Sequence, residues 1–367
     1  MVFNMESNTS ERKDEHLELS LDDRIEGPNT TWLEHVHLIH NPLPELSLDD
    51  VDIKVRFLGK ELRAPLIILG MTGGTEKAYN VNRELAKLAN EFGIAIGVGS
   101  QRAMIENRSV EYTYRVVREF ASDVPVIANI GATQLVRYDI RDIERIIEVL
   151  EADALAVHMN PAQELIQPEG DRDFRGVLRR LVQLRDVISV PIIVKEVGTG
   201  IPREVAKILY DAGIRYFDVG GAGGTNWIAI EMLRLQRRGL ENAKIARNFL
   251  SWGIPTAVSV VEVRDAAPNA TIIASGGIRT GIDVAKCIAL GSDLAGFARP
   301  VLKALIAGNA REFLKEVIDE LRMAMLLVGA KDLEELKRAS IVILDKLAQW
   351  ICARRLKVRN PRAYIPC

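Results

Sequence analysis

Short apolar runs alternate with helical patterns along most of the chain from Pro65 onward. The runs have the length of buried parallel strands. They cover residues 66–69, 94–98, 126–128, 154–157, 192–194, 216–219, 272–274 and 294–297. Strands that alternate with helices form a parallel sheet with right-handed crossovers. Eight such runs predict a closed (β/α)8 TIM barrel, an α/β fold, over residues 65–309.

Helical patterns separate most of the runs. The clearest cover residues 76–92, 140–150, 174–187, 203–212 and 282–290. Gly93, Gly213 and Gly291 follow three of these segments, as glycine does at many helix ends. Residues 257–263 are rich enough in valine for a strand, but Pro255-Thr256 suits a helix start. We predict a helix there, since a ninth strand would not fit the barrel.

Two segments flank the predicted barrel. Residues 1–64 do not show the repeat, and we expect an N-terminal arm whose first residues are disordered. Residues 310–367 contain helical patterns at 313–327 and 332–354. We expect these C-terminal helices to pack on the outside of the barrel.

The composition narrows the class of protein. The 367 residues are 48% hydrophobic and 27% charged, with a formal net charge of −2. This charge gives no case for a nucleic-acid partner, and no apolar run is long enough for a membrane span. Cys287, Cys352 and Cys367 form no motif, which favours a reducing compartment. The N-terminus lacks the apolar core of a signal peptide, so we expect a cytoplasmic protein.

The stretch from 271 to 300 predicts a phosphate site. Ser275-Gly276-Gly277 follows the seventh apolar run, and Ala298-Arg299 follows the eighth. Two glycines let an anion approach the backbone, and we expect the next helix, near Ile282, to point free N–H groups at it. The loops after strands 7 and 8 of such barrels commonly bind phosphate.

Polar residues follow the other predicted strands too. They are Thr72 with Gly73-Gly74, Ser100-Gln101-Arg102, Asn129, His158, Asn160, Lys195-Glu196, Asp218 and Thr225. The carboxyl ends of barrel strands form one rim, so these residues predict a single site. Lys195 could form a Schiff base or contact the carbonyl edge of a flavin. The phosphate site favours FMN, which joins a phosphate to a redox ring.

The richest segment is HMNPAQELIQPEGD, from His158 to Asp171. Pro161 prevents a helix from running on out of the strand, so we predict a loop above the barrel. Glu164 is a hard oxygen ligand, and Mg²⁺ often takes one carboxylate together with substrate phosphates. Glu231 lies in an apolar helical stretch, where it is either a solvent-facing residue or a proton carrier.

Two charged or metal-binding patterns near the N-terminus are ambiguous from pattern alone. Arg12-Lys13 suits either a solvated surface or a functional contact. His35, His37 and His40 suggest a metal, but no cysteine or carboxylate spacing supports a zinc site there.

At these residues the sequence resembles the type 2 isopentenyl-diphosphate isomerases, an FMN-dependent family. The matching segments are Arg12-Lys13 with Glu15-His16, MTGG at 71–74, GVGSQR at 97–102, HMNPAQE at 158–164, QPEGD at 167–171, VKE at 194–196, GGTNWIAIEM at 223–232, WGIPTA at 252–257 and SGGIRTGID at 275–283. HxNPAQE with QPEG is specific to that family, whereas many FMN barrels share the glycine loops.

The resemblance implies a role for each matching residue. FMN would contact Thr72, Gly73, Gly74, Ser100, Asn129, Lys195 and Thr225, and its phosphate would contact Gly277, Arg279, Ala298 and Arg299. The substrate diphosphate would contact Arg12, Lys13, Ser100, Gln101, Arg102, His158, Asn160 and Gln163. The catalytic groups would be Gln163, Glu164, Glu231 and His158, with Glu164 binding Mg²⁺.

The family interconverts isopentenyl and dimethylallyl diphosphate at reduced FMN, in isoprenoid biosynthesis. The resemblance therefore implies NADPH or another reductant for the flavin, and a homotetramer or homo-octamer. It makes Arg12-Lys13 part of a lid that closes over the substrate and excludes water. This chain differs from the usual pattern at Val197, at Val219, Gly220 and Ala222, and at Arg299, which bears on individual flavin contacts.

Two other functions are weighed against the isomerase. An FMN-dependent oxidoreductase of a small hydroxy acid would place a His–Arg or Cys centre beside the flavin. Here Cys287 lies within a helical pattern, and His158 belongs to the isomerase segment. A non-catalytic flavin-binding barrel would not need Gln163, Glu164 and Lys195 together.

Overall fold

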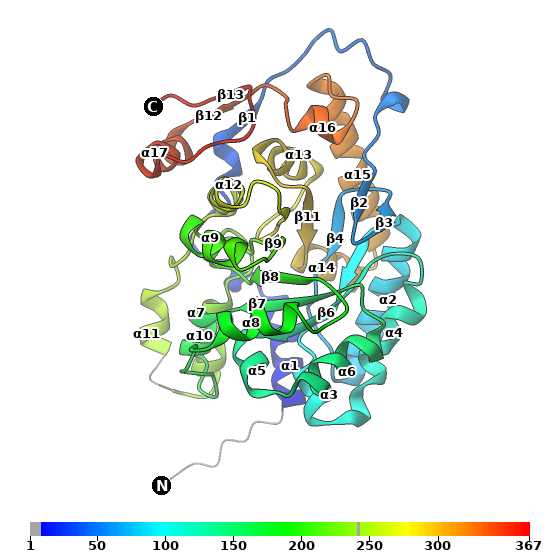
Figure 1. Ribbon diagram of the computed structural model, residues 1–367, viewed down its shortest axis with the longest axis vertical. Helices are drawn as coiled ribbons and strands as arrows, with labels where there is room; N and C mark the ends of the chain where they lie inside the picture. The colour runs from blue at the N-terminus through cyan, green and yellow to red at the C-terminus, as the bar shows by residue number, and fades with distance from the viewer. Residues whose placement is uncertain (1–8, 241–242) are drawn as a thin grey trace.

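A closed barrel of eight parallel strands forms the centre of the protein, in a computed structural model that describes residues 9–240 and 243–367 (Figure 1). The strands are β4 (Leu66–Ile68), β5 (Ala95–Gly97), β6 (Val126–Gly131), β7 (Ala154–Met159), β8 (Ile192–Glu196), β9 (Tyr216–Asp218), β10 (Thr271–Ala274) and β11 (Leu294–Phe297). β11 closes the barrel by pairing with β4, where Gly296 lies opposite Ile67. Each strand coincides with a predicted run, so the TIM barrel is confirmed.

Helices surround the barrel as the alternation predicts. They are α2 (Glu76–Phe92), α4 (Tyr112–Phe120), α6 (Ile140–Leu150), α8 (Val177–Arg185), α9 (Arg203–Asp211), α12 (Thr256–Ala266), α13 (Gly281–Leu290) and α14 (Arg299–Ala307). The valine-rich segment is helical, as predicted. Its side chains from Thr256 to Arg264 are all buried, because the C-terminal α17 (Asp345–Arg354) covers its outer side. A helix covered on all sides can be apolar all round.

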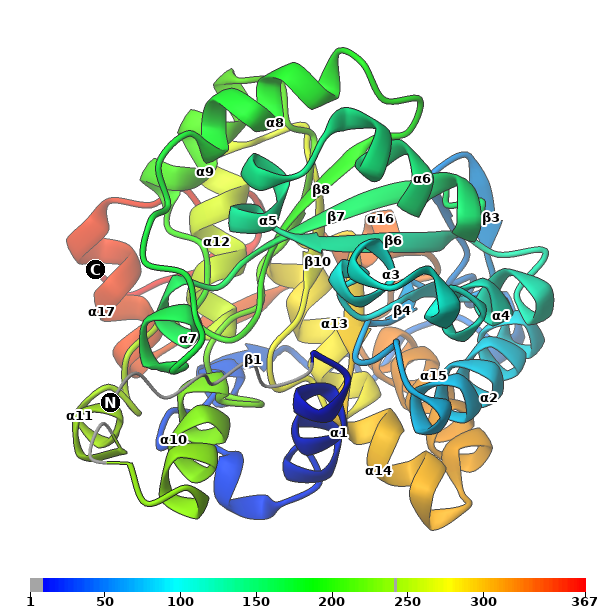
Figure 2. The same cartoon turned by 90° about the horizontal axis from the view of Figure 1, so that it is seen from below.

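Short elements lie at the carboxyl ends of the strands. They are α1 (Thr9–Leu19), η1 (Asp23–Ile25), α3 (Arg102–Glu106), η4 (Arg108–Val110), α5 (Ala132–Arg137), α7 (Pro161–Ile166), α10 (Trp227–Arg237) and α11 (Ala243–Asn248). A further short helix, η2 (Leu33–His35), lies against α13 and α17. From below, α1 lies between α10 and α14 (Figure 2). The expected disorder concerns residues 1–8, which lie outside the described residues.

The segment after β7 corrects one prediction. It forms the short helix α7 rather than a loop, and Pro161 is the first residue of this helix. The missing N–H of proline costs nothing there, because the first N–H groups of a helix have no partner within it. Proline ends the strand and starts a new helix, which turns Gln163 and Glu164 over the barrel.

A hairpin closes the opposite end of the barrel. It consists of β2 (Val55–Phe57) and β3 (Lys60–Leu62), joined antiparallel. Phe57 and Leu62 are buried in the same apolar cluster as the inward-facing side chains of the barrel strands. The barrel therefore opens only toward the rim that carries the polar residues, as far as the described residues go.

The C-terminal region is not purely helical, which corrects the prediction for 310–367. It contains α15 (Ala310–Leu327), α16 (Leu333–Leu336), β12 (Ile341–Ile343), α17 and β13 (Ala363–Tyr364). β12 pairs antiparallel with β1 (Val36–Leu38) and parallel with β13. A separate short helix, η3 (Leu48–Asp50), precedes the hairpin. Consecutive β-branched residues favour the extended form of β12 once this distant partner is available.

The cysteines also correct the sequence-based reading. Cys352 in α17 forms a disulfide with Cys367, because the chain turns back through β13 and brings the two Cα atoms to 5.7 Å. Cys287 is free and buried. The inference from unpaired cysteines to a reducing compartment therefore loses its basis. Among the described helices, none is long and apolar enough to cross a membrane.

Candidate active site

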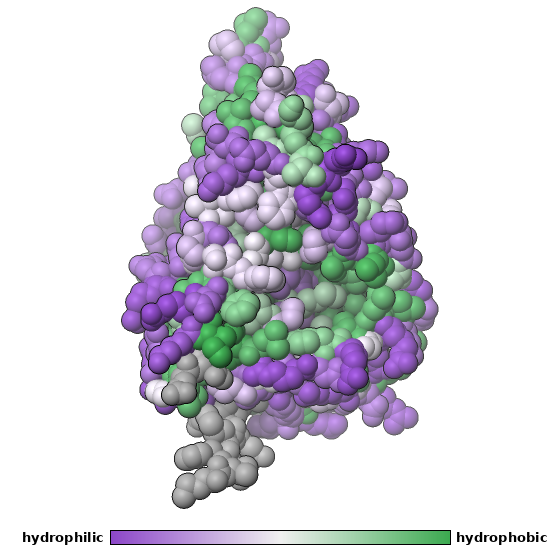
Figure 3. Space-filling model, turned by 90° about the vertical axis from the view of Figure 1, so that its left-hand side faces the viewer, coloured by the Kyte–Doolittle hydropathy of each residue, from purple (hydrophilic) through white to green (hydrophobic). Residues whose placement is uncertain are grey.

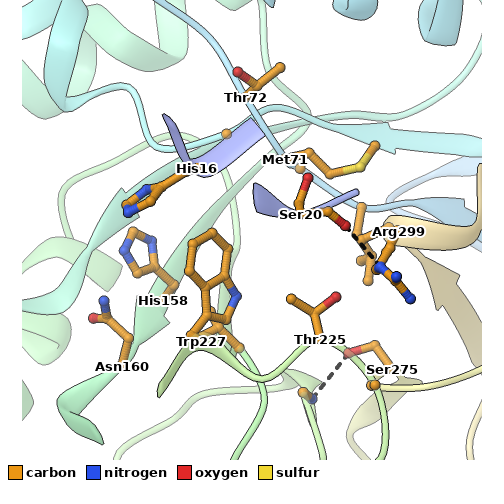
Figure 4. A pocket seen from close by; sticks show the side chains of 18 of the residues that line it. His16, Ser20, Met71, Thr72, His158, Asn160, Thr225, Trp227, Ser275 and Arg299 are labelled. Atoms are coloured by element: carbon orange, nitrogen blue, oxygen red, sulfur yellow. Dashed lines mark hydrogen bonds between the residues drawn. The ribbon is translucent and has the colours of Figure 1, made fainter. Parts of the chain in front are cut away.

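A cavity of about 480 Å³ lies at the carboxyl ends of the barrel strands. Residues that follow each of the eight strands line it, and α1 supplies Arg12, Lys13 and His16 from the other side. In Figure 4, His16 and His158 lie near Trp227, while Ser20 and Arg299 lie at the other side of the view. The convergence of strand ends predicted from the sequence is therefore present, and the N-terminal arm completes the walls.

Lys13 is anchored deep in the rim. Its Nζ donates to the Ser100 carbonyl oxygen at 2.6 Å and contacts the Tyr114 hydroxyl at 2.5 Å. Burial, together with the positive charges of Arg12 and Arg102, lowers the pKa of Lys13 to about 7. The three cations line the same cavity, which makes this part of the rim suited to a multiply charged anion.

The opposite part of the cavity has the backbone of a phosphate site. Gly276 and Gly277 have φ values of 96° and 81°, which only glycine adopts without strain. Among the described residues, the amides of Gly276, Gly277 and Ile278 donate to no acceptor. Consecutive free amides of this kind form anion-binding concavities.

The helix at this site is α14 rather than α13, which corrects the sequence-based reading. The N-terminus of α13 is already satisfied: Thr280 and Asp283 form a capping box, and Gly281 donates to Glu320. α14 begins after Ala298 without a side-chain cap, and its first residues line the cavity. The free helix N-terminus therefore belongs to the loop after β11.

Arg279 and Arg299 contact acidic residues of the N-terminal segment. Arg299 pairs with Glu26 and, at 2.6 Å, with Asp23, and its Nε donates to the Ser20 carbonyl oxygen at 2.8 Å (Figure 4). Arg279 approaches the other oxygen of Glu26 at 3.3 Å. Both predicted phosphate arginines thus line the cavity, but Glu26 bridges them.

The middle of the cavity holds the predicted ring contacts. Lys195 donates to Asp218 at 2.7 Å, and Ser275 donates to the same carboxylate. The hydroxyl of Thr72 is buried and has no hydrogen-bond partner among the described residues. Ser100, Asn129 and Thr225 line the cavity as predicted. Gly73 and Gly74 do not line it, and Gly73 packs against Tyr114.

His158 is held as a neutral imidazole. Its Nδ1 lies 2.8 Å from Asn129 Oδ1, and the Asn129 amide nitrogen donates to the Val98 carbonyl oxygen. This network assigns the proton to Nδ1 and leaves Nε2 as an acceptor. Burial, followed by the charges of Lys195 and Lys13, lowers the pKa of His158 to about 3.

Helix α7 and the end of β7 supply a connected set of polar side chains. The Asn160 amide nitrogen donates to Gln163 Oε1 at 3.0 Å and to Glu164 Oε1 at 3.1 Å. Asp171 N donates to the second carboxylate oxygen of Glu164 at 2.7 Å. The Gln163 amide nitrogen is thereby left to point at Glu231 Oε1, 3.2 Å away.

Glu231 is fully buried, which removes the reading of a solvent-facing residue. His16 contacts it at 2.8 Å and Arg234 at 2.6 Å. Burial alone would raise the pKa of Glu231, but the charges and hydrogen bonds of His16 and Arg234 outweigh it and lower the pKa to about 2. One orientation of the Gln167 side-chain amide satisfies two partners: its nitrogen donates to Glu231 Oε1 and its oxygen accepts from Arg12.

Gln101 corrects one predicted substrate contact. Its side chain is completely buried below the rim, where its nitrogen donates to the Ile146 carbonyl oxygen and its oxygen accepts from Asn129 N. It holds the β5 and β6 ends together. Sequence reasoning did not identify Glu26 or Arg234, and it assigned no role to His16 although it lies in the matching Glu15-His16 pair.

The metal prediction rests on one carboxylate. Among the described residues, no group of three His, Cys, Asp or Glu side chains is placed to hold a metal ion, and this includes the histidines near position 37. Glu164 lines the cavity, but each of its oxygens already accepts one hydrogen bond.

Comparison with known proteins places this site in a family. The family model described as FMN-dependent dehydrogenase matches residues 141–343. An isopentenyl-diphosphate delta-isomerase of Sulfurisphaera tokodaii is 46% identical over 95% of both chains. One of Aeropyrum pernix is 46% identical over 98% of this chain and 96% of its own. The chain belongs to the isopentenyl-diphosphate delta-isomerase family. This confirms the resemblance drawn from the sequence.

Solved structures show that the isomerase family shares its barrel with other enzymes. A lactate oxidase of Pediococcus acidilactici superimposes with a TM-score of 0.67 at 17% identity, covering 91% of this chain and 93% of its own. A mandelate oxidase gives 0.63 at 18% identity, covering 90% and 98%. At such identities the likeness shows the fold alone.

Proposed function

We propose that this protein interconverts isopentenyl and dimethylallyl diphosphate, with FMN held across the barrel mouth. The observation that carries the proposal is the convergence of Gln163, Glu164 and His158 on one cavity that also contains the backbone of a phosphate site. The naming of relatives with 43–46% identity as isopentenyl-diphosphate delta-isomerases supports the same reaction.

The residues present fit FMN. The free amides of Gly276, Gly277 and Ile278 and the N-terminus of α14 suit its phosphate. The unpartnered hydroxyl of Thr72 and the amine of Lys195 suit polar atoms of its ring. Reduced FMN supplies an electron-rich ring that stabilises positive charge and exchanges protons. Arg279 and Arg299 already pair with Glu26, so they can contact the FMN phosphate only if Glu26 and the phosphate share these two arginines.

Mg²⁺ fits at Glu164 together with the substrate. One protein carboxylate and several diphosphate oxygens form a common Mg²⁺ environment. Asn160 and Asp171 hold the Glu164 carboxylate in place, and each of its oxygens keeps a further lone pair. The ion would neutralise part of the diphosphate charge next to Arg12, Lys13 and Arg102.

The proton steps take place at the end of the cavity that Gln163 and Glu231 face. Protonation of an unactivated alkene gives a tertiary carbocation, which water would trap in an open site. Gln163, hydrogen-bonded to Glu231, orients the proton-carrying group at this end. α1, whose His16 contacts the same carboxylate, excludes water there. His158 and Asn160 position the diphosphate.

The oxidoreductase alternative receives no support from the side chains. Cys287 is buried within α13 and does not line the cavity. His158 is held by Asn129 with its pKa lowered, which makes it a poor base for abstracting a hydroxyl proton.

Three further properties complete the proposal. NADPH or another external donor reduces the flavin, and the protein acts in the cytoplasm. It assembles as a homotetramer or homo-octamer. Apolar side chains gather on the lower half of the face in Figure 3, and Ile245, Phe249 and Trp252 of the α11 region are exposed, with Trp252 at 62%. Exposed aromatic residues of this kind are common in subunit interfaces.

Substitutions on α7 test the proposal. Gln163→Leu should lower kcat for dimethylallyl diphosphate formation by about 10²-fold, while FMN binding stays unchanged. Glu164→Gln should raise the Mg²⁺ concentration needed for half-maximal rate. Leu165→Ala, an exposed residue on the same helix, is the matched control and should behave as the unsubstituted protein. Unchanged kinetics in both test variants would rule out these roles, and absence of product from the unsubstituted protein would rule out the function.

A further inference from the structure

Arg234 of α10 is a buried arginine whose purpose the proposed reaction does not yet explain. Its side chain is only 1% exposed. Each of its three nitrogens contacts a different carboxylate: Nη1 lies 2.6 Å from Glu231, Nε 2.9 Å from Glu15, and Nη2 2.8 Å from Glu169. A planar guanidinium can satisfy three directed contacts in this way, and a lysine amine cannot reproduce the geometry.

The three carboxylates belong to three separate parts of the site. Glu15 lies on α1, next to Arg12 and Lys13. Glu169 follows α7, which carries Gln163 and Glu164. Glu231 lies one turn before Arg234 on α10 and contacts Gln163. Arg234 therefore touches the arm, the α7 segment and the candidate proton carrier with one side chain.

The surrounding charges nearly balance. Three carboxylates face Arg234, while Arg12 lies 3.9 Å from Glu169, His16 lies 2.8 Å from Glu231, and Arg238 lies 3.1 Å from Glu15. A buried charge is tolerated only with partners, so removing one member leaves the others uncompensated. The arrangement is complete only while α1 lies against α10.

We propose that Arg234 is a positioning residue that links closure of α1 to the charge and position of Glu231. This inference rests on the proposed isomerase function. Arg234 keeps Glu231 as a carboxylate directed at Gln163, and it holds α1 and the Glu169 segment against the cavity. When α1 moves away, Glu231 also loses His16, so a proton-transfer chain is assembled only in the closed form.

Burial and the positive partners act on the pKa of Glu231 in opposite directions, so a positioning role for Arg234 can be detected in the pH dependence of kcat. Burial by itself favours the protonated form of Glu231, and the positive partners reverse that preference. Weakening the Arg234 contact should therefore raise the pKa of Glu231 and move the acidic limb of the kcat profile to higher pH. A role confined to packing would lower stability or flavin content without moving that limb.

The experiment compares Arg234→Lys, Glu15→Gln and their combination in the reduced holoenzyme. Arg237→Lys is the matched control, because Arg237 joins the same two helices through an exposed pair with Glu18. Arg234→Lys should lower kcat by about tenfold or more and shift its acidic limb upward. Glu15→Gln should raise KM and the rate of tryptic cleavage near Arg12. Its kcat profile should keep the acidic limb in place, because saturating substrate holds α1 closed and His16 stays on Glu231. The double variant should show less than the product of the two separate effects.

Two results would overturn the inference. These are an unshifted pH profile in Arg234→Lys, or a Glu15→Gln variant with unchanged KM and proteolysis. If Arg234→Lys does not fold, Glu15→Gln alone tests whether the contact between Glu15 and Arg234 holds α1 in place. Protection of α1 from trypsin by inorganic pyrophosphate is measured in parallel and needs no turnover. Its dependence on Glu15 and Arg234 tests the arm contact even if isomerisation is absent, so the two failures are distinguishable.

Discussion

Lys13 and His158 both have lowered pKa values that an anion in the cavity would raise. Burial lowers the pKa of Lys13 to about 7 and that of His158 to about 3. A diphosphate beside them would favour the protonated forms and raise both values. Binding and proton uptake are therefore coupled at these two residues.

This coupling predicts proton uptake when isopentenyl diphosphate binds to the holoenzyme with oxidised flavin at pH 8. Above pH 7 the free Lys13 amine is mostly neutral and must be protonated to pair with the anion, so affinity should also fall as pH rises. Calorimetry in two buffers of different ionisation enthalpy measures the uptake. Lys13→Arg should reduce it, because a guanidinium is already charged. Equal uptake in both proteins would contradict the role of Lys13.

From pattern alone, individual site residues were predictable where a strand end placed them. Lys195, Asn129 and His158 follow barrel strands, and the rim rule therefore located them correctly. Gln101 also follows a strand but points below the rim, because its amide oxygen accepts from Asn129 of β6 and its amide nitrogen donates to Ile146 of α6. The sequence left Glu231 either solvent-facing or a proton carrier, since the partners that bury it come from α1 and α7, far away in sequence.

At the level of elements, acidic side chains fasten the N-terminal segment to the cofactor end of the barrel. Glu26 lies between Arg279 and Arg299, and Asp23 adds a second contact to Arg299. A carboxylate in this position competes with a phosphate for the same guanidinium groups. The N-terminal arm, which carries the predicted diphosphate-binding residues Arg12 and Lys13, is therefore connected to the predicted flavin phosphate site.

We expect Glu26→Gln to bind FMN more tightly, by about two- to fivefold, because it releases the exposed Arg279 and the buried Arg299 from a competing charge. Titration of flavin fluorescence with the apoprotein measures this change. Asp22→Asn, which alters a partly exposed carboxylate paired with Arg24, provides the control. Weaker FMN binding in Glu26→Gln would instead mean that Glu26 orders the arginines for the phosphate.

Elements were predictable where their pattern is local. The barrel strands and helices such as α2 and α6 repeat a local apolar period, and their ends match within a few residues. β12 was missed because its partner β1 lies about 300 residues earlier, so no local signal reports the pairing. α7 was missed because the proline was taken only as a helix breaker, although it also suits the first helical position.

At the level of the whole molecule, one barrel serves different chemistries. The fold is shared with lactate and mandelate oxidases, whereas the relatives with about 45% identity are isomerases. In this molecule the two ends of the barrel are covered differently. The β2–β3 hairpin closes one end, while α1, α7 and α10 enclose the cavity at the other. Fold and family could be inferred from the sequence, whereas the links between these enclosing segments required the structure.

The most direct test of the account is an anaerobic assay of isopentenyl diphosphate with protein, FMN and Mg²⁺, with the flavin either oxidised or chemically reduced. The account predicts dimethylallyl diphosphate only with reduced flavin, and no net oxidation of the flavin during turnover. FMN binding without product in either redox state would contradict it, and so would equal rates in both states.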